Sequence, residues 1–126
     1  MHRSRLAGFI MDCRTDDLEK AAQFWSAALG VPLRPAAEEP SPLYRELLTK
    51  PGDLHIEVQK VEHDSRVHID IETDDIEAEA SRLEALGAKR VKSVHTWCVM
   101  EAPTGQRFCL VRPQRAQFKE QANVWK

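Results

Sequence analysis

The sequence contains two copies of one pattern, and this repeat constrains the fold more than any other feature. Residues 9–17 read FIMDCRTDD and residues 67–75 read VHIDIETDD, so an aspartate, a threonine and a pair of aspartates recur about 58 residues apart. The similarity continues to Gly30 in the first copy and Gly87 in the second. Two such copies nearly fill the 126 residues, which indicates an internal duplication and not a longer repeat array.

The composition excludes several classes of protein. A chain of 126 residues has the size of one domain. The net charge of −2 lacks the basic character of a dedicated nucleic-acid-binding protein, and no apolar run approaches the roughly 20 residues that span a membrane. Three cysteines without C-x-x-C spacing argue against a disulfide framework and a zinc ribbon. We therefore expect a cytoplasmic protein with no nucleic-acid or membrane partner.

Each copy is expected to begin with a strand. Apolar and polar residues alternate over 9–14 and over 67–72, as they do in a half-buried strand. Three further strands are expected to complete each copy, at 31–34, 43–48 and 54–60 in the first and at 89–94, 96–101 and 107–112 in the second.

A helix is predicted after the first strand of each copy. Apolar residues recur at three- and four-residue steps over 18–29 and 76–86. Both predicted helices have capping signals at both ends: Asp16 with Glu19 and Asp74 with Glu77 at the starts, and Gly30 and Gly87 at the ends.

The expected fold is therefore α+β, with two tandem βαβββ modules forming a curved mixed sheet. Helices cover the outer face of this sheet, and the other face is a concave cup. Within a single domain over 1–126, module one covers about residues 7–62 and module two about 65–112. Residues 113–126 lie outside the repeat and are interpreted as a loosely held tail.

Alternation along the strands places polar side chains together on the open face. A concave face with such groups can be a ligand site, or it can be a solvated surface whose charges pair with one another. The pattern alone leaves both interpretations open. The candidate site residues on this face are Asp12, Glu57, Gln59, His68, Asp70, Trp97, Arg107 and Cys109.

The two copies also carry the motifs of a known family. The first contains DCRTDDLEKAAQFWSAALG, and the second contains VHIDIETDDIEAEASRLEALGA followed by MEAPTGQRFCLV. Over about residues 8–112 the chain resembles the glyoxalase/bleomycin resistance/dioxygenase (vicinal oxygen chelate) superfamily, in its glyoxalase-like branch. The resemblance implies the doubled βαβββ fold. It does not imply one activity, because this fold hosts isomerases, dioxygenases, thiol transferases and binding proteins.

The resemblance further implies one divalent metal in the cup, which chelates two neighbouring oxygens of a substrate. His68 matches one ligand position, and Glu57 or Gln59 matches a second. Ile10 and Cys109 occupy the other two, so an apolar side chain and a soft thiol replace the usual ligands. A site of Glu57, His68 and Cys109 suits zinc better than magnesium. Manganese, iron and nickel also remain open, as does a protein without any metal.

Two main functions follow as hypotheses. The first is a glyoxalase-like, metal-assisted lyase, isomerase or dioxygenase-type enzyme with a degenerate metal site, in which Glu57 and His68 are the catalytic residues. The alternative is metal-independent binding or sequestration of a small molecule, as in resistance proteins. In that case Trp97 supplies a stacking surface, and Asp12, Asp70 and Glu57 supply charge. A third interpretation is an interaction module whose cup is filled by its own side chains. We also expect a homodimer, as is common in this family.

Overall fold

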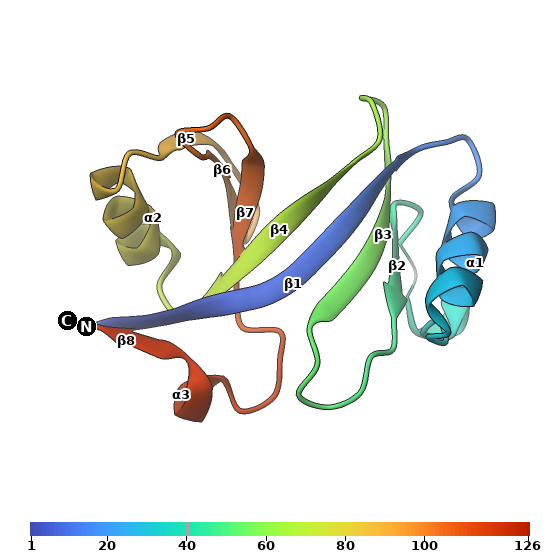
Figure 1. Ribbon diagram of the computed structural model, residues 1–126, viewed down its shortest axis with the longest axis horizontal. Helices are drawn as coiled ribbons and strands as arrows, with labels where there is room; N and C mark the ends of the chain where they lie inside the picture. Colours follow the sequence, from blue (N-terminus) through green and yellow to red (C-terminus); the bar gives the residue numbers. More distant parts are fainter. Residues whose placement is uncertain (40) are drawn as a thin grey trace. The chain divides into compact units, whose positions relative to one another are not determined.

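The computed structural model describes residues 1–39 and 41–126, which form one mixed sheet with helices packed against it (Figure 1). The strands are ordered β2-β3-β1-β4-β7-β6-β5, and β8 pairs with β1. The β4–β7 ladder is parallel, whereas β2–β3, β5–β6 and β6–β7 are antiparallel. The α+β class and the mixed sheet are therefore confirmed. The elements are β1 (His2–Arg14), α1 (Leu18–Leu29), a 3-10 turn (Ala36–Glu38), β2 (Tyr44–Leu47), β3 (His55–Val61), β4 (Arg66–Thr73), α2 (Ile76–Ala85), β5 (Lys89–Val94), β6 (Trp97–Glu101), β7 (Arg107–Val111), α3 (Phe118–Gln121) and β8 (Asn123–Trp125).

The chain divides into two compact units, each with its own core. Unit 1 contains residues 1–8 and 68–126, and unit 2 contains residues 9–67, so β1 and β4 run through both. In unit 2, α1 packs on β2 and β3. In unit 1, α2 packs on β5, β6 and β7. Several of the inward-facing residues predicted from alternation form these cores: Met11 and Val58 in unit 2, and Cys98, Met100, Phe108 and Leu110 in unit 1. In β4 the prediction is wrong for Val67 and Ile69, which alternation places on the covered face but which are exposed. None of the helices in the described part of the chain is long and apolar enough to cross a membrane.

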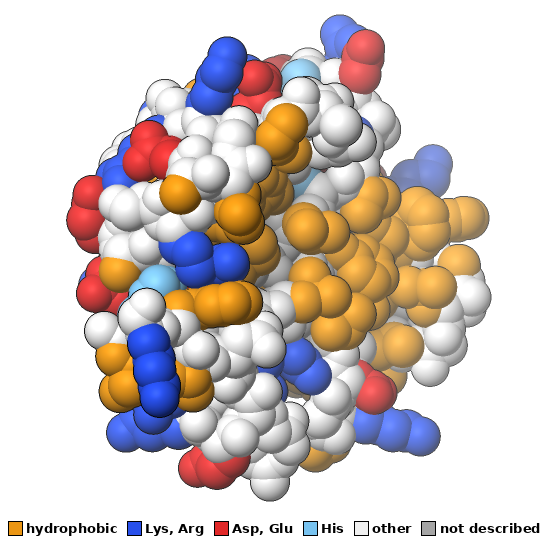
Figure 2. Space-filling view, turned by 60° about the vertical axis from the view of Figure 1, so that its left-hand side comes forward, with side chains coloured by type: hydrophobic (Ala, Val, Ile, Leu, Met, Phe, Trp, Pro, Cys, Tyr) orange, Lys and Arg blue, Asp and Glu red, His pale blue; other side chains and the backbone are white. Residues whose placement is uncertain are grey.

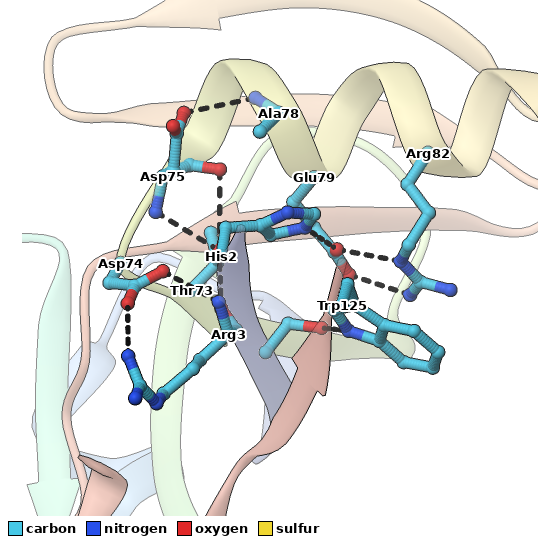
Figure 3. Close-up of polar contacts among 10 residues, drawn as sticks. His2, Arg3, Thr73, Asp74, Asp75, Ala78, Glu79, Arg82 and Trp125 are labelled. Carbon is cyan, nitrogen blue, oxygen red and sulfur yellow. Dashed lines mark hydrogen bonds and ion pairs between the residues drawn. The ribbon is translucent and has the colours of Figure 1, made fainter.

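The N-caps of both long helices lie one residue later than predicted, although the helices begin at Leu18 and Ile76, where the apolar spacing predicts them. The N-caps are Asp17 and Asp75, whose side chains accept hydrogen bonds from the N–H groups of Lys20 and Ala78. The reason is the threonine two residues before each cap: its hydroxyl accepts the N–H of the capping aspartate and adds a turn before the helix. Asp74, predicted as a cap, instead accepts the N–H of Arg3 (Figure 3).

The predicted capping boxes are also wrong. Glu19 and Glu77 lie two residues after the observed caps, too early to close a box, and they bind Arg45 and Arg90 instead. At the other end of α1 the prediction is confirmed, because Gly30 is the C-cap in the left-handed conformation with φ of 67°.

One predicted strand is missing from the regular structure. Residues 31–34 contribute only an isolated bridge between Leu33 and Leu47. Pro32 lies within this segment and Pro35 follows it directly, and proline has no N–H to donate to a sheet ladder. The first copy therefore has a β-bridge where the second copy has β5.

The C-terminal segment is not the loosely held tail that the sequence suggests. It forms α3 and β8, and β8 pairs antiparallel with residues 2–4 of β1, beside which it lies in Figure 1. β1 is accordingly longer at its start than the predicted strand over 9–14. The sequence interpretation missed this because both partners lie outside the repeat.

A buried ion pair holds this segment in unit 1. Arg5 Nε donates to Glu72 Oε2 over 2.5 Å, and neither side chain is more than 9% exposed. Glu72 Oε1 accepts the backbone N–H groups of Gln114 and Arg115, at 2.6 and 2.9 Å. Arg5 also donates to the carbonyl of Ala116 at 2.8 Å. We call this pair the Arg5–Glu72 clamp.

A second buried network joins the first strand, α2 and the last strand (Figure 3). His2 Nε2 lies 2.7 Å from Glu79 Oε1, and the Arg82 guanidinium donates to both Glu79 oxygens at 2.8 Å. The same guanidinium stacks over the Trp125 ring, 3.9 Å from its centroid. The Trp125 indole N–H donates to the Ser4 hydroxyl at 2.8 Å. The two chain ends are thus tied to α2 through Glu79.

We expect this network to make folding stability depend on pH below about 4.5. Burial alone would raise the pKa of Glu79, but hydrogen bonds from Arg82, His2 and Ser4 outweigh it and lower the pKa to about 2, from an ordinary 4.5. A carboxyl whose pKa is lowered by folding stabilises the fold fully above its ordinary pKa. That contribution is lost as the pH falls through the folded value.

Thermal unfolding between pH 7 and pH 2 tests this expectation. Glu79→Gln should cost about 1–3 kcal/mol at neutral pH, and its Tm should fall less steeply in acid than that of the unmutated chain. Glu62→Gln, at an exposed position, should behave like the unmutated chain. Parallel pH curves for Glu79→Gln and the unmutated chain would contradict the role given to Glu79.

Candidate metal centre

Three neighbouring strands of unit 1 present one set of side chains on the face opposite α2. Asp70 lies opposite Cys109 across the β4–β7 ladder, and Val99 lies opposite Cys109 across β6–β7. Cross-strand partners share a face, and every second residue along a strand joins them. Five of the residues that alternation assigns to the open face belong to this set, namely His68, Asp70, Trp97, Arg107 and Cys109, together with Glu72, Val99, Glu101 and Val111.

Within this face His68, Asp70 and Cys109 form a cluster of possible metal ligands. One ligand atom from each residue, an imidazole nitrogen, a carboxylate oxygen and a sulfur, lies within 4.8 Å of the other two. Asp70 is 5% exposed, and its Oδ1 has no hydrogen-bond partner among the described residues. His68 Nε2 approaches that oxygen to 3.5 Å. A buried carboxylate oxygen without a hydrogen bond is costly, and a cation would satisfy it. The donor set therefore fits a metal ion.

The other two thiols have a different environment. Burial raises the pKa of Cys98, which lies in the core under α2, and burial also raises the pKa of Cys13, which packs against the α1 core. A thiol with a raised pKa stays protonated and unreactive near neutral pH. Of the three cysteines, Cys109 is the one that lies beside other possible metal ligands, His68 and Asp70.

Glu57 and Gln59 lie on β3 in unit 2, where each has a polar partner. His55 Nε2 lies 2.6 Å from Glu57 Oε1, and the Gln59 amide donates to the Tyr44 hydroxyl at 3.0 Å. The cluster in unit 1 therefore contains Asp70 where the sequence hypothesis had Glu57. His55 received no role from the sequence, although its two-residue spacing from Glu57 places both side chains on one face of the strand.

Two β1 residues of the predicted face are buried, whereas the third, Arg14, is exposed. Asp12 is 3% exposed, and its Oδ2 lies 3.5 Å from Arg66 Nε. Ile10, which occupies a ligand position in the family resemblance, is 4% exposed. Asp12, Asp70 and Glu72 are all buried, so these three carboxylates do not form the solvated surface that the sequence left open.

Trp97 and Arg107 share the face of the cluster but do not belong to it. The Trp97 side chain is half-buried, with its ring centroid 6.0 Å from that of His95. Arg107 is exposed, and its Nε donates to Glu101 at 3.1 Å. Their assignment to ligand binding stays a prediction.

Comparison with known proteins identifies the family. The family model described as the glyoxalase-like domain matches residues 8–111. The chain belongs to this family. The membership confirms the resemblance drawn from the repeat, and the matched range spans both copies of the glyoxalase-like motif.

Solved structures share the fold of this glyoxalase-like domain. A hypothetical protein of Bacillus halodurans C-125 matches with a TM-score of 0.62 at 14% identity, covering 96% of this chain and 99% of that one. A methylmalonyl-CoA epimerase in complex with methylmalonyl-CoA and NH4+ matches with a TM-score of 0.56 at 16% identity, covering 92% and 97%. A variant of the Streptomyces coelicolor methylmalonyl-CoA epimerase, in complex with 2-nitronate-propionyl-CoA, gives 0.55 at 16%, covering 90% and 96%. A search of curated proteins found no match. At these identities the similarity shows the fold alone.

Proposed function

We propose that this glyoxalase-like domain is a metal-assisted enzyme that acts on a small molecule, with zinc held by His68, Asp70 and Cys109. The observation that carries the proposal is the buried Asp70 Oδ1, which has no hydrogen-bond partner among the described residues and faces an imidazole and a thiol. Three protein ligands that leave one position for water or substrate are typical of catalytic zinc sites.

The donor set distinguishes among the metals that the family resemblance implies. A thiolate is a soft ligand, which favours zinc over magnesium or manganese, whereas an imidazole suits several of these metals. A Cys109 thiolate and an Asp70 carboxylate together neutralise the two charges of a zinc ion. Zinc is therefore the proposed cofactor.

The chain's own residues have separate roles in this proposal. A bound zinc ion supplies Lewis-acid chemistry, polarising an oxygen of the substrate. Asp70 and Cys109 provide negative charge, and His68 provides a neutral nitrogen ligand. The sequence also predicts Glu57 as a catalytic residue, and a role for it in proton transfer stays a prediction.

We propose methylmalonyl-CoA as the first substrate to test. The similarly folded epimerase is seen in complex with this compound, which has an acidic C–H bond next to a thioester carbonyl. A lyase, isomerase or dioxygenase-type reaction on another small carbonyl compound belongs to the same proposal.

Metal-independent binding of a small molecule is the second candidate. It is supported by Trp97, a half-buried aromatic side chain on the face that carries the cluster, because aromatic rings provide stacking surface for ligands. Under this alternative the polar side chains Asp12, Gln59, Asp70 and Arg107 would supply contacts to the ligand.

A thermal-shift experiment separates the two candidates. Protein freed of metal with a chelator should gain about 2.7 kcal/mol of stability from zinc at 100 times its dissociation constant, which raises the Tm of a domain of this size by several degrees. Magnesium should have no such effect. The metal-assisted function fails if zinc, manganese, iron, nickel and magnesium all leave the Tm unchanged and protein purified without chelator contains none of them. That result would favour the metal-independent alternative.

We also propose that the chain forms a homodimer in solution. Large apolar side chains remain exposed at the surface (Figure 2), including Val67 and Ile69 of β4 at 62% and 47%. Exposed apolar surface of this kind is often covered by a partner. Light scattering should give a mass near twice 14.4 kDa. A mass near 14.4 kDa at micromolar concentration would contradict the dimer.

A further inference from the structure

Three basic side chains lie on the edge strand of unit 1, and two of them share a face with the proposed metal site. β5 is the last strand in the sheet order, and Lys89, Arg90 and Lys92 are all exposed. In the β5–β6 ladder Lys89 lies opposite Glu101, and Lys92 lies opposite Val99. Glu101 and Val99 belong to the face that carries the cluster. Because cross-strand partners share a face, both lysine side chains project from that face.

A bulge in β5 produces this arrangement. The register shifts between Arg90 and Lys92, so Val91 is an extra residue in the strand. In a regular strand Lys92 would lie on the face opposite to that of Lys89, because side chains alternate. A bulge redirects the side chains that follow it. Arg90 stays on the other face, where its guanidinium binds Glu77 of α2. The bulge therefore directs both lysines toward the face of the metal site.

One row of residues across the sheet joins Lys92 to the metal site. Lys92 lies opposite Val99 in β6, and Val99 lies opposite Cys109 in β7. Cys109 in turn lies opposite Asp70 in β4. Neighbouring strands are about 4.8 Å apart, so the backbone at Lys92 is about 10 Å from the backbone at Cys109. Lys89 lies in the adjacent row, about 7 Å away along the strand direction. Two flexible ammonium groups can therefore converge on one group that is bound over Val99.

The carboxylates on this face already have cationic partners. Glu101, the ladder partner of Lys89, accepts the Arg107 Nε at 3.1 Å, so a guanidinium balances its charge. Glu72 belongs to the buried Arg5–Glu72 clamp. The remaining anionic groups are the proposed zinc ligands, whose two negative charges balance the metal. None of these carboxylates is left to balance the charge of the lysines.

We infer that Lys89 and Lys92 form a phosphate-binding subsite beside the metal site. Neither ammonium forms an ion pair with another described residue, so the face carries two unbalanced positive charges. A phosphate monoester has a charge near −2 at neutral pH and three acceptor oxygens, whereas a carboxylate balances only one lysine. The inference rests on the proposed function. It narrows the substrate class to small phosphorylated compounds, with the phosphate separated from the metal-bound oxygens by the width of Val99.

Lysines and bulges on an edge strand also have a purely structural use, because they discourage pairing with a strand of another chain. Such protection depends on charge and shape alone. It predicts neither a preference for phosphate over other anions nor any cooperation with a bound metal. Binding measurements therefore distinguish a phosphate subsite from simple edge protection.

Titration of metal-free protein with inorganic phosphate tests the subsite by itself, with binding followed by NMR of the β5 and β6 amides at constant ionic strength. Lys89→Gln and Lys92→Gln should each weaken phosphate binding up to about fivefold, and the double variant about tenfold or more, as expected for exposed ion pairs. Lys119→Gln removes the same charge at an exposed position of α3 and should bind like the unmutated chain. Equal phosphate affinities of the double variant and Lys119→Gln would overturn the inference, as would equal affinities of the unmutated chain for phosphate and acetate.

A bridging compound tests the connection between the subsite and the metal. Hydroxamates chelate zinc, so a hydroxamate with a phosphate at the end of a short alkyl chain can occupy both positions at once. On zinc-loaded protein it should bind at least about tenfold more tightly than the matched hydroxamate with a methyl end, because the second contact is intramolecular. The Lys89→Gln, Lys92→Gln double variant should lose this gain. An equal gain in the double variant would overturn the inference.

The same compounds separate this inference from the proposed function. The methyl-ended hydroxamate should bind equally to the zinc-loaded unmutated chain and to the zinc-loaded double variant, because neither lysine is a ligand of the cluster. Failure of the unmutated chain to bind zinc would overturn the proposed function, and the phosphate titration of metal-free protein does not depend on that result. Zinc binding without any phosphate binding would overturn the inference alone.

Discussion

Replacing Arg5 with alanine should lower the free energy of unfolding by about 3–5 kcal/mol, because it breaks a buried ion pair. The substitution leaves the Glu72 carboxylate, which is 0% exposed, with only the backbone N–H groups of Gln114 and Arg115. An uncompensated charge in the interior is strongly unfavourable, whereas breaking an exposed ion pair costs little. For a domain of this size the Tm should fall by roughly 10 °C or more.

The matched control is Arg14→Ala. Arg14 pairs with Asp64 at 3.0 Å, but the two side chains are 65% and 97% exposed, so its loss should cost less than about 1 kcal/mol. Chemical denaturation of both variants measures the difference. Equal stabilities for Arg5→Ala and Arg14→Ala would show that the clamp does not hold the C-terminal segment.

Removing a ligand of the cluster should have the largest effect on metal affinity. Cys109→Ser replaces a thiolate with a neutral hydroxyl, and Asp70→Asn removes a charged oxygen ligand. Mutating a residue that only hydrogen-bonds to a metal ligand typically lowers metal affinity by about 10–100-fold. Removing a ligand itself should cost more, so each substitution should weaken zinc binding by at least about 100-fold. Competition against a chromophoric chelator measures this change.

Cys13→Ser provides the control for that series. Cys13 packs against the α1 core in unit 2, and burial raises its pKa, so its replacement should leave zinc affinity within about threefold, well below a ligand's effect. Equal affinities for Cys109→Ser and Cys13→Ser would exclude Cys109 as a ligand.

Much of the fold could be predicted because the repeat reports local structure twice. The alternation over 9–14 and 67–72 and the helical spacing over 18–29 and 76–86 agree with β1, β4, α1 and α2. The N-caps were misplaced by one residue, because each observed cap donates its N–H to a threonine hydroxyl two residues earlier, and spacing alone does not reveal this turn.

The missed features depend on contacts between residues far apart in the sequence. β8 is a short strand that forms against residues 2–4, and no periodicity marks either partner. Arg5 and Glu72 are 67 positions apart in the sequence and meet because β1 and β4 are neighbours in the sheet.

The candidate site could be predicted only in part, because it too depends on contacts between residues far apart in the sequence. Alternation assigned His68, Asp70 and Cys109 to one face, but their closeness depends on the parallel β4–β7 register, which the sequence does not contain. The contact of His55 with Glu57 depends on the rotamers of these two side chains. The contact of His55 with Glu46 depends on the β2–β3 register. Glu57 as a metal ligand stays a prediction.

Cobalt substitution tests the metal site most directly, because a cobalt(II) ion bound by a thiolate has a charge-transfer absorption band. Metal-free protein titrated with cobalt(II) should bind one ion per chain and develop this band, with zinc displacing cobalt in accordance with its preference for such a site. The band should be absent in Cys109→Ser and present in Cys13→Ser. A titration of the unmutated chain that gives no band, or the same band in Cys109→Ser, would contradict metal binding by His68, Asp70 and Cys109.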